Sequence, residues 1–452
     1  MKVGKILCAV CLIATGSLCF GAEWYVSIGN GKNKNAGTAE APLKNLWKAL
    51  EKSAAGDTIY VAEGNYPGKM SKGWIEIEKP VSIYGGYSKD FKERDVLKYR
   101  TMLRPTNEQN ATKPTFGTLT INTGDTFAKQ QQFGPKALLV VDGFIFDQTD
   151  ANNYHGSKGK PEGFADGMLT IPPAKGTKPN PSIDRYLVYG KTNGEVIIRN
   201  CLVLNGSNYA LILHHFAGKV SVINNVFIGN RMVAVDVLSS NAKPFAVDYE
   251  FANNTVLFTW TRTTEFSDMG YGVRANSKVA SNIHHNLIGL NCMAGFDNTK
   301  GAAKEKKIKF DNNVFFLNKK ADVAITVSPN IKFMKAGDDG FDDLEDLEGM
   351  ESVSNNTSLK DPSVFKGIID ENYLNAFLSA TYTETTDYDP NSPANIFRSA
   401  LGMNKQGTIT SKVSMFANPY DLESALKFFG ALQGAGAQKP VQDRIPGVLY
   451  NR

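Results

Sequence analysis

The chain has 452 residues, of which 42% are hydrophobic and 21% are charged. This composition excludes a disordered chain and is typical of a globular protein with one large core or several smaller ones. The formal net charge is only +5, and no block of basic residues suited to nucleic acid is present, so we expect no nucleic-acid partner.

The first 21 residues read as a signal peptide. Lys2 and Lys5 precede an apolar run over residues 6–20, and Cys19 and Gly21 place small residues at the cleavage contacts. The run is too short for a membrane span. Cleavage removes two lysines and lowers the net charge from +5 to +3. We therefore expect a secreted, periplasmic or cell-surface protein without a membrane span.

The segment after the signal peptide predicts a strand, a helix and a second strand. Trp24 begins the first strand, residues 42–53 form an amphipathic helix, and residues 58–61 form the strand after the turn at Gly56. A repetitive stack of strands needs its open end covered, so we expect this helix to cap the N-terminal end.

An asparagine followed by an apolar run recurs five times in the middle of the chain. The second asparagine of each motif stands at positions 200, 225, 254, 286 and 313, so the intervals are 25, 29, 32 and 27 residues. Each motif is followed by another short alternating run, with no helical stretch between them. Such periods indicate stacked units, and the short strands predict one coil of a parallel β-helix per unit. Stacked asparagines at a fixed turn would hydrogen-bond from coil to coil.

The N-terminal segment and the repeats together resemble the secreted pectate-lyase-like right-handed parallel β-helix proteins. The shared features are a Gly/Asn-rich turn after Trp24, the Pro42 before the helix, and the Gly-Asp-Thr-Ile-Tyr-Val strand over residues 56–61. The resemblance spans about residues 24–330. It implies an all-β right-handed parallel β-helix (a solenoid) with an N-terminal capping helix and an irregular C-terminal capping region.

The resemblance also implies a domain organisation. Residues 1–21 form the signal peptide, residues 22–330 the β-helix with its cap, and residues 331–452 an extension packing on the last coil. It implies no single activity, because that superfamily includes polysaccharide lyases, glycoside hydrolases, epimerases and noncatalytic proteins.

Alignment of the second run of each coil predicts which side chains face the core. The expected inward column is Ile212, Val235, Val273, Phe296 and Ile325. The neighbouring outward columns contain small residues and charged ones, which would leave a shallow trough; the small ones after Leu211 are Ala234, Gly272, Gly295 and Ala324.

Three charged residues of the outward columns invite a comparison with lyases. Lyases of the family use such a face, with acidic Ca²⁺ ligands and an arginine or lysine as base. The resemblance therefore implies Asp236 and Asp297 as metal ligands and Arg274 as the catalytic base. Adjacent coils lie about 4.8 Å apart, so the two aspartates would be roughly 9.6 Å apart with Arg274 between them. A surface ladder of ion pairs is the alternative.

The interval between residues 146 and 195 predicts a long insertion. Its oxygen-bearing side chains include Asp147 and Asp166, which are candidate Ca²⁺ ligands, and Tyr154 is a candidate for substrate binding. A solvated loop rich in turn-forming residues is the alternative interpretation.

Two further residues are candidates for substrate binding. The parity of the second run places His214 inward and His215 outward, on the same face as the charged column. Trp260 could stack on a sugar ring, or it could serve in packing. Cys201 and Cys292 lie in apolar strands and are expected to be buried thiols without a disulfide.

Two functions of different classes follow. The first is an exported enzyme acting on uronate-containing polysaccharide by β-elimination, with Ca²⁺ as a possible cofactor. The second is a noncatalytic carbohydrate-binding or surface structural protein that uses the same long face. In either case we expect a monomer whose partner is a polysaccharide or oligosaccharide.

Overall fold

The structure is a computed structural model of the chain. It describes residues 21–69, 74–104, 117–148, 186–206, 208–260, 270–299, 307–327, 330–338, 341, 344, 346, 349–381, 388–407, 409–410, 419–441 and 443–444.

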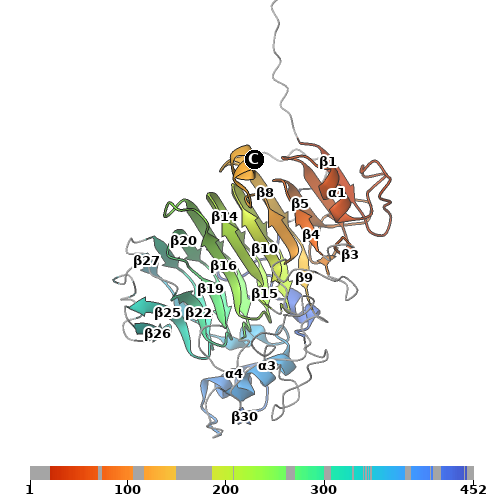
Figure 1. The fold of residues 1–452 in the computed structure, drawn as a ribbon. Coiled ribbons are helices and arrows are strands. Elements are labelled where there is room, and N and C mark those ends of the chain that lie inside the picture. Colours follow the sequence, from red (N-terminus) through yellow and green to blue (C-terminus); the bar gives the residue numbers. More distant parts are fainter. Residues whose placement is uncertain are drawn as a thin grey trace, which may run out of the picture.

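The described residues form a parallel β-helix of three sheets, here called A, B and C (Figure 1). The chain passes from sheet A to sheet B to sheet C and back, so each strand pairs with the strand one coil away. Every pairing within the three sheets is parallel except that of β25 with β26, which is antiparallel. The predicted all-β parallel β-helix is therefore confirmed.

The strands of the three sheets are as follows. Sheet A contains β1 (Glu23–Val26), β2 (Thr58–Ala62), β5 (Ser82–Tyr87), β8 (Leu138–Asp142), β11 (Glu195–Arg199), β14 (Gly218–Ile223), β17 (Val247–Ala252), β20 (Val279–His284), β23 (Ile308–Asp311) and β27 (Met350–Ser354). Sheet B contains β3 (Gly64–Tyr66), β6 (Thr101–Leu103), β9 (Ile145–Asp147), β12 (Leu202–Leu204), β15 (Val226–Ile228), β18 (Thr255–Leu257), β21 (Leu287–Gly289), β24 (Val314–Phe316) and β28 (Thr357–Ser358). Sheet C contains β4 (Ile75–Ile77), β7 (Gly117–Asn122), β10 (Tyr186–Thr192), β13 (Leu211–His215), β16 (Val233–Ser239), β19 (Tyr271–Arg274), β22 (Ala294–Asn298), β25 (Ala321–Val327) and β26 (Asn330–Met334).

Outside the three sheets lie the short helices and one small strand pair. The helices are α1 (Leu46–Lys52), α2 (Phe127–Phe133), η2 (Pro362–Phe365), α3 (Glu371–Ser379), α4 (Pro393–Leu401) and α5 (Leu422–Leu426), and the strand pair is β29 (Ala380–Thr381) with β30 (Ile409–Thr410). Helix α1 buries Leu46, Ala49 and Leu50 in the main core. Its role as a cap remains a prediction. No helix among the described residues is long and apolar enough to cross a membrane.

The turn from sheet A to sheet B explains the asparagine motif. The first residue of the motif has a positive φ in six coils, which asparagine tolerates better than most residues: Asn200, Asn224, Asn253, His285, Asn312 and Asn355. In the four central coils the second residue is a buried asparagine whose side-chain oxygen accepts from the backbone of the preceding coil. Asn225, Asn254, Asn286 and Asn313 form this column, and each donates its backbone N–H to the next at 2.9–3.1 Å, ending on Asn356.

One predicted member of this column is wrong. Asn200 aligns with Asn224 in the positive-φ position, because Leu202 pairs with Val226 in sheet B. Cys201 therefore stands where the next coil has Asn225, and its backbone N–H donates to the Asn225 side chain at 2.9 Å. Cys201 and Cys292 are buried free thiols, as predicted.

A second asparagine column lies at the turn from sheet B to sheet C, and sequence analysis missed it. Asn291 donates its backbone N–H to the Asn318 side chain at 3.1 Å, and Thr259 donates to Asn291 in the same way at 3.0 Å. The signal was present, because a residue of this column follows each asparagine of the first column by five positions: Asn230, Thr259, Asn291 and Asn318.

The register of sheet C corrects the predicted inward column at its two ends. Leu211 pairs with Val235, and Phe296 pairs with Val323. Ile212 was predicted to face inward, but it pairs with Asp236 in the outward column. Val323, and not Ile325, therefore continues the inward column after Phe296. Ile325 is also buried in the core, two residues further along the same strand. A one-residue slip in alignment moves a side chain to the other face, because the strand period is two.

The predicted trough of small residues is absent from the described part of sheet C. A Cβ on Gly295 would lie 2.8 Å from the buried side chain of Ile288, and one on Gly272 would lie 3.2 Å from Asn291 Nδ2, so both glycines face the interior. Ala234 is also a core residue.

The C-terminal boundary and packing also differ from the prediction. Strands β27 and β28 pair with β23 and β24 and add a further coil, so the β-helix runs to Ser358 and does not end at residue 330. The described residues of the extension after Ser358 pack along the outer face of sheet B and not on the last coil alone. Phe258 of the central coils, for example, contacts the rings of Tyr373, Phe377 and Tyr420 at centroid distances of 5.0–5.5 Å.

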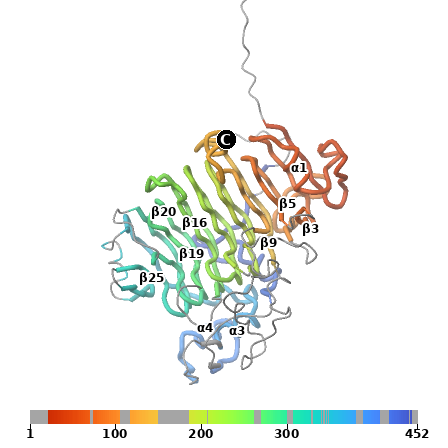
Figure 2. Tube along the Cα trace, viewed as in Figure 1, coloured from red at the N-terminus to blue at the C-terminus, as the bar shows by residue number. Residues whose placement is uncertain are grey.

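The last described residues of the extension lie beside the N-terminal coils (Figure 2). We call residues 436–441 together with 443 and 444 the C-terminal strap. Its contacts follow the stack from coil to coil, through Gly436 with His285, Ala437 with Thr255, Gln438 with Asn224, Asp443 with Arg94, and Arg444 with Tyr87.

We expect Asn254→Leu to destabilise the stack. Asn254 Oδ1 accepts from the Asn225 backbone N–H at 2.9 Å, and Asn254 Nδ2 donates to the Val222 carbonyl at 2.8 Å. Leucine leaves both buried groups unpaired, at about 1–3 kcal/mol each, so the free energy of unfolding should fall by about 2–6 kcal/mol. Urea denaturation of both proteins measures this difference, and coincident curves would contradict it.

The second asparagine column offers a control variant that should not lower the free energy of unfolding. Thr259 Oγ1 is buried without a hydrogen-bond partner, whereas Asn291 in the next coil uses its side chain. Thr259→Asn should leave the free energy of unfolding unchanged or raise it by about 1 kcal/mol.

Candidate functional site

The predicted column of charged residues is present on sheet C, but its side chains are buried. Asp236 pairs in register with Arg274, and Arg274 with Asp297, on consecutive strands β16, β19 and β22. Arg274 donates through Nε to Asp297 and through Nη1 to Asp236 at 3.4 Å. The three side chains are only 0–3% exposed. The predicted surface ladder of exposed ion pairs is therefore wrong.

These residues do not fit a Ca²⁺ site. The remaining oxygens of the two carboxylates are also occupied, because Asp236 Oδ1 accepts from Asn276 at 2.7 Å and Asp297 Oδ1 accepts from the Thr299 N–H at 2.9 Å. The guanidinium of Arg274 occupies the position between the carboxylates that a cation would need. The described residues contain no group of three or more His, Cys, Asp or Glu side chains that could hold a metal ion.

Arg274 is equally unsuited to act as a base. Burial alone would lower its pKa, but the carboxylates of Asp297 and Asp236 outweigh burial and raise the pKa above its ordinary value. A base must release its proton near the working pH, and this environment stabilises the protonated form. The predicted catalytic role of Arg274 is therefore wrong, and the ion group is structural.

We expect Arg274→Ala to be strongly destabilising. The variant leaves the carboxylates of Asp236 and Asp297 buried without a counter-charge, which costs about 3–5 kcal/mol. Lys309→Ala is the matched control, because Lys309 pairs with Glu351 at 3.4 Å on the surface, where both side chains are about half exposed. That exposed pair should contribute about 0–1 kcal/mol. Denaturation midpoints that shift equally in the two variants would contradict the burial of the ion group.

His215 faces the interior, so its predicted outward position and its role in substrate binding are wrong. Its ring is fully buried, and Nδ1 lies 2.8 Å from the Thr192 hydroxyl one coil away. His214 is the partly exposed member of the pair. The reversal has the same cause as that of Ile212, because Lys191, His214 and Leu238 share one outward column in sheet C.

The buried ring of His215 makes stability depend on pH. Burial lowers its pKa from 6.5 to about 4, so the unfolded chain takes up the proton first as the pH falls. The free energy of unfolding should therefore decrease between about pH 6.5 and pH 4, by about 3 kcal/mol in total. His215→Gln should remove that part of the pH dependence in denaturation curves at a series of pH values. His214→Gln, its half-buried neighbour, should change the slope less.

Trp260 is also in the core. It is fully buried, its Nε1 donates to the Gly229 carbonyl at 3.1 Å, and the guanidinium of Arg231 lies 5.6 Å from its ring centroid. The packing alternative therefore holds, and stacking on a sugar is wrong.

The predicted insertion begins later and ends earlier than expected. Tyr186–Thr192 is strand β10 of sheet C, so the coil pattern resumes before residue 195. Asp147 lies at the end of β9 on sheet B, nearly buried, where it accepts from Asn205 Nδ2 at 3.2 Å and pairs with Arg104 at 3.8 Å. It is not on the face of Asp236. Tyr154 and Asp166 lie outside the described residues.

Sequence analysis missed an aromatic cluster on the outer face of sheet C. Tyr186 and Tyr189 of β10 stack with centroids 5.4 Å apart, Tyr209 lies 6.0 Å from Tyr186, and His214 lies 6.0 Å from Tyr189. All four side chains are partly exposed. The alternating run Val188-Tyr189-Gly190-Lys191-Thr192 before the turn at Gly194 is a strand signal that could have revealed them.

The surroundings of the cluster are polar and carry positive charge. Lys191 is exposed and pairs in register with His214 on the adjacent strand. Burial and the charge of Lys191 lower the pKa of His214, so its ring is neutral at pH 7. The Tyr209 hydroxyl lies 3.5 Å from Arg274 Nη1, so the cluster borders the buried ion group.

Comparisons with known proteins leave the activity of this chain open. The family model described as "Protein of unknown function (DUF1565)" matches residues 29–142. No curated protein sequence matches the chain. Among solved structures, pectate lyase Pel9A aligns at 14% identity over 66% of this chain and 70% of that chain, with a TM-score of 0.32.

Two further solved structures align at a similar level. XylC in complex with xylose has 12% identity over 67% of this chain and 63% of that chain, with a TM-score of 0.31. A rhamnogalacturonan lyase has 12% identity over 68% and 77%, with a TM-score of 0.30. At these identities and TM-scores the alignments carry no argument about activity.

Proposed function

We propose that this chain binds a uronate-containing polysaccharide along the outer face of sheet C, outside the cytoplasm. The observation that carries the proposal is the aromatic cluster of Tyr186, Tyr189, Tyr209 and His214. Four rings within 5.4–6.0 Å of their neighbours, all partly exposed, offer apolar faces and polar edges in one place. A sugar ring has the same combination, with C–H groups on its faces and hydroxyls at its rim, so aromatic side chains bind it well.

The charge beside the cluster favours an acidic glycan. Lys191 projects from the same face as Tyr189, two residues away on β10, and is exposed. His214 is neutral at pH 7, so among the described residues Lys191 is the exposed charged group next to the rings, whereas Arg274 is buried. An exposed ammonium group attracts a carboxylate and sets its position relative to the stacked sugar.

Binding without elimination is the better-supported form of this proposal. Elimination needs a base beside the ligands of a cation, and the residues predicted for those roles form a closed ion group. Binding needs only aromatic and hydrogen-bonding groups, and the cluster supplies them.

We expect Tyr189→Ala to weaken binding of uronate oligosaccharides. Loss of one stacking ring costs about 1–1.5 kcal/mol, which corresponds to about a five- to tenfold rise in Kd. Tyr388→Ala is the control, because Tyr388 is 57% exposed and lies in the C-terminal extension. Calorimetric titration of the two variants and the wild type with a panel of uronate oligosaccharides measures the effect. Equal affinities for all three proteins would contradict the proposal that the aromatic cluster binds the glycan.

The same panel separates the two classes of function. Incubation with and without Ca²⁺, followed by absorbance of the unsaturated product, tests for elimination. Product formation would contradict the noncatalytic form of the proposal and would require a base other than Arg274.

A further inference from the structure

A cavity of about 420 Å³ lies on the outer face of sheet A. Its volume is within the range of about 300–1,000 Å³ that is usual for small-ligand sites. Strands β2 and β5 form its floor, and α2 and the start of β8 form one wall. The described lining residues are Ala55, Gly56, Thr58, Tyr60, Pro80, Ser82, Tyr84, Gln132, Phe133, Ala137, Leu138 and Arg444.

The floor of the cavity follows from the strand register. Thr58 of β2 pairs with Ser82 of β5, and Tyr60 of β2 pairs with Tyr84 of β5. All four residues carry hydroxyl groups and line the cavity. The rings of Tyr60 and Tyr84 stack with centroids 6.3 Å apart and an interplanar angle of 27°. The Tyr60 hydroxyl donates to Glu23 at 2.9 Å. The Tyr84 hydroxyl has no hydrogen-bond partner among the described residues.

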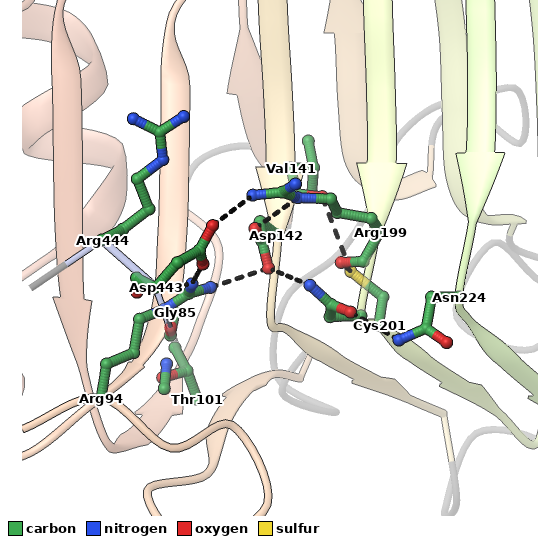
Figure 3. A network of polar contacts seen from close by, with 12 residues as sticks. Gly85, Arg94, Thr101, Val141, Asp142, Arg199, Cys201, Asn224, Asp443 and Arg444 are labelled. Carbon is green, nitrogen blue, oxygen red and sulfur yellow. Dashed lines mark hydrogen bonds and ion pairs between the residues drawn. The ribbon is translucent and has the colours of Figure 1, made fainter. Parts of the chain in front are cut away.

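The C-terminal strap brings a cation to this cavity. Asp443, the residue before Arg444, pairs with Arg94 at 2.9 Å and with Arg199 at 3.5 Å. Both arginines also pair with the buried carboxylate of Asp142, each at 2.7 Å. These four side chains anchor the strap to the N-terminal coils (Figure 3).

Arg444 itself takes no part in the anchoring network through its side chain. The Tyr87 hydroxyl donates to the Arg444 carbonyl oxygen, so the backbone is held while the side chain extends away from the network (Figure 3). The guanidinium carbon lies 5.7 Å from the ring centroid of Tyr84. Among the described residues, Nε is buried without a hydrogen-bond partner, and no carboxylate pairs with the guanidinium.

The cavity therefore combines one cation with several hydroxyl groups. Arg444 is the only charged side chain among the described lining residues. A guanidinium presents donors in a planar fork that matches a carboxylate. Tyr84, Ser82, Thr58 and Gln132 supply groups that can hydrogen-bond to hydroxyls, and the tyrosine rings supply apolar contact.

We infer that this cavity is a separate binding site for a carboxylated sugar unit, a hexuronate, whose carboxylate pairs with Arg444. The site lies on sheet A and does not depend on the aromatic cluster of sheet C. Together the two proposals describe a chain that binds acidic glycan on the outer face of sheet C and one acidic sugar unit on the outer face of sheet A.

Calorimetric or NMR titration of the full chain with glucuronate, glucose, acetate and inorganic sulfate tests the inference. Glucuronate should bind at least about tenfold more tightly than glucose, because glucose lacks the group that pairs with the guanidinium. It should also bind more tightly than acetate or sulfate, which lack the sugar hydroxyls. Equal affinities for glucuronate and glucose would overturn the inference, and so would sulfate binding as tight as that of glucuronate.

Variants locate the site. Arg444→Gln should lower glucuronate affinity at least about tenfold, whereas Arg444→Lys should keep part of it. Lys439→Gln removes the same charge from an exposed position on the strap and should bind as the wild type does. In a Tyr189→Ala background, which weakens the sheet C cluster, Arg444→Gln should still lower glucuronate affinity about tenfold, so the two sites can fail separately. Unchanged binding by Arg444→Gln would place the ligand elsewhere and overturn the inference.

Discussion

The structure depends on how a solenoid satisfies the backbone groups at its turns. The central coils bend sharply between sheets A and B, and the N–H group after each bend is buried away from water. In the central coils an asparagine oxygen from the next coil accepts that N–H, as Asn254 does for Asn225. Because an unpaired buried amide costs free energy comparable to a lost hydrogen bond, the column couples each coil to its neighbour. The second column, through Asn291 and Asn318, does the same between sheets B and C.

The short strands of sheet B impose the next constraint. Each has two or three residues, so its outward apolar side chains would be exposed if the coils stood alone. The C-terminal extension covers them with Phe365, Leu374, Phe377 and Phe428, which join the outer side chains of sheet B in one cluster. The strap then continues to the N-terminal coils, where Asp443 pairs with Arg94. The extension therefore contributes to the stability of the whole stack of coils.

The three outer faces consequently differ in what they can do. Sheet B is covered by the extension. Sheet C carries partly exposed tyrosines beside Lys191, next to an ion group whose charged side chains pair with one another inside the protein. Sheet A carries a cavity at its N-terminal end, and the strap completes it by supplying Arg444. The buried ion group and the strap network are both arginine–carboxylate clusters, yet neither leaves a carboxylate arranged for a metal ion. Their charges stabilise the fold, whereas Lys191 and Arg444 remain accessible to a ligand.

The sequence by itself determined the parallel β-helix, the positions of the central coils and the asparagine motif at their turns, because coil period and turn chemistry are local properties of the chain. It also placed Asp236, Arg274 and Asp297 on consecutive strands. Only the tertiary structure decided that this column is buried, that His215 and Trp260 face the core, and that Asn200 belongs to the neighbouring column. The face on which His215 lies and the column to which Asn200 belongs both depend on the register of strand pairing. A slip of one residue in that register moves a side chain to the opposite face or to a neighbouring column. The cavity beside Arg444 joins residues 58 and 444, and no local pattern encodes a contact between segments so far apart in the chain.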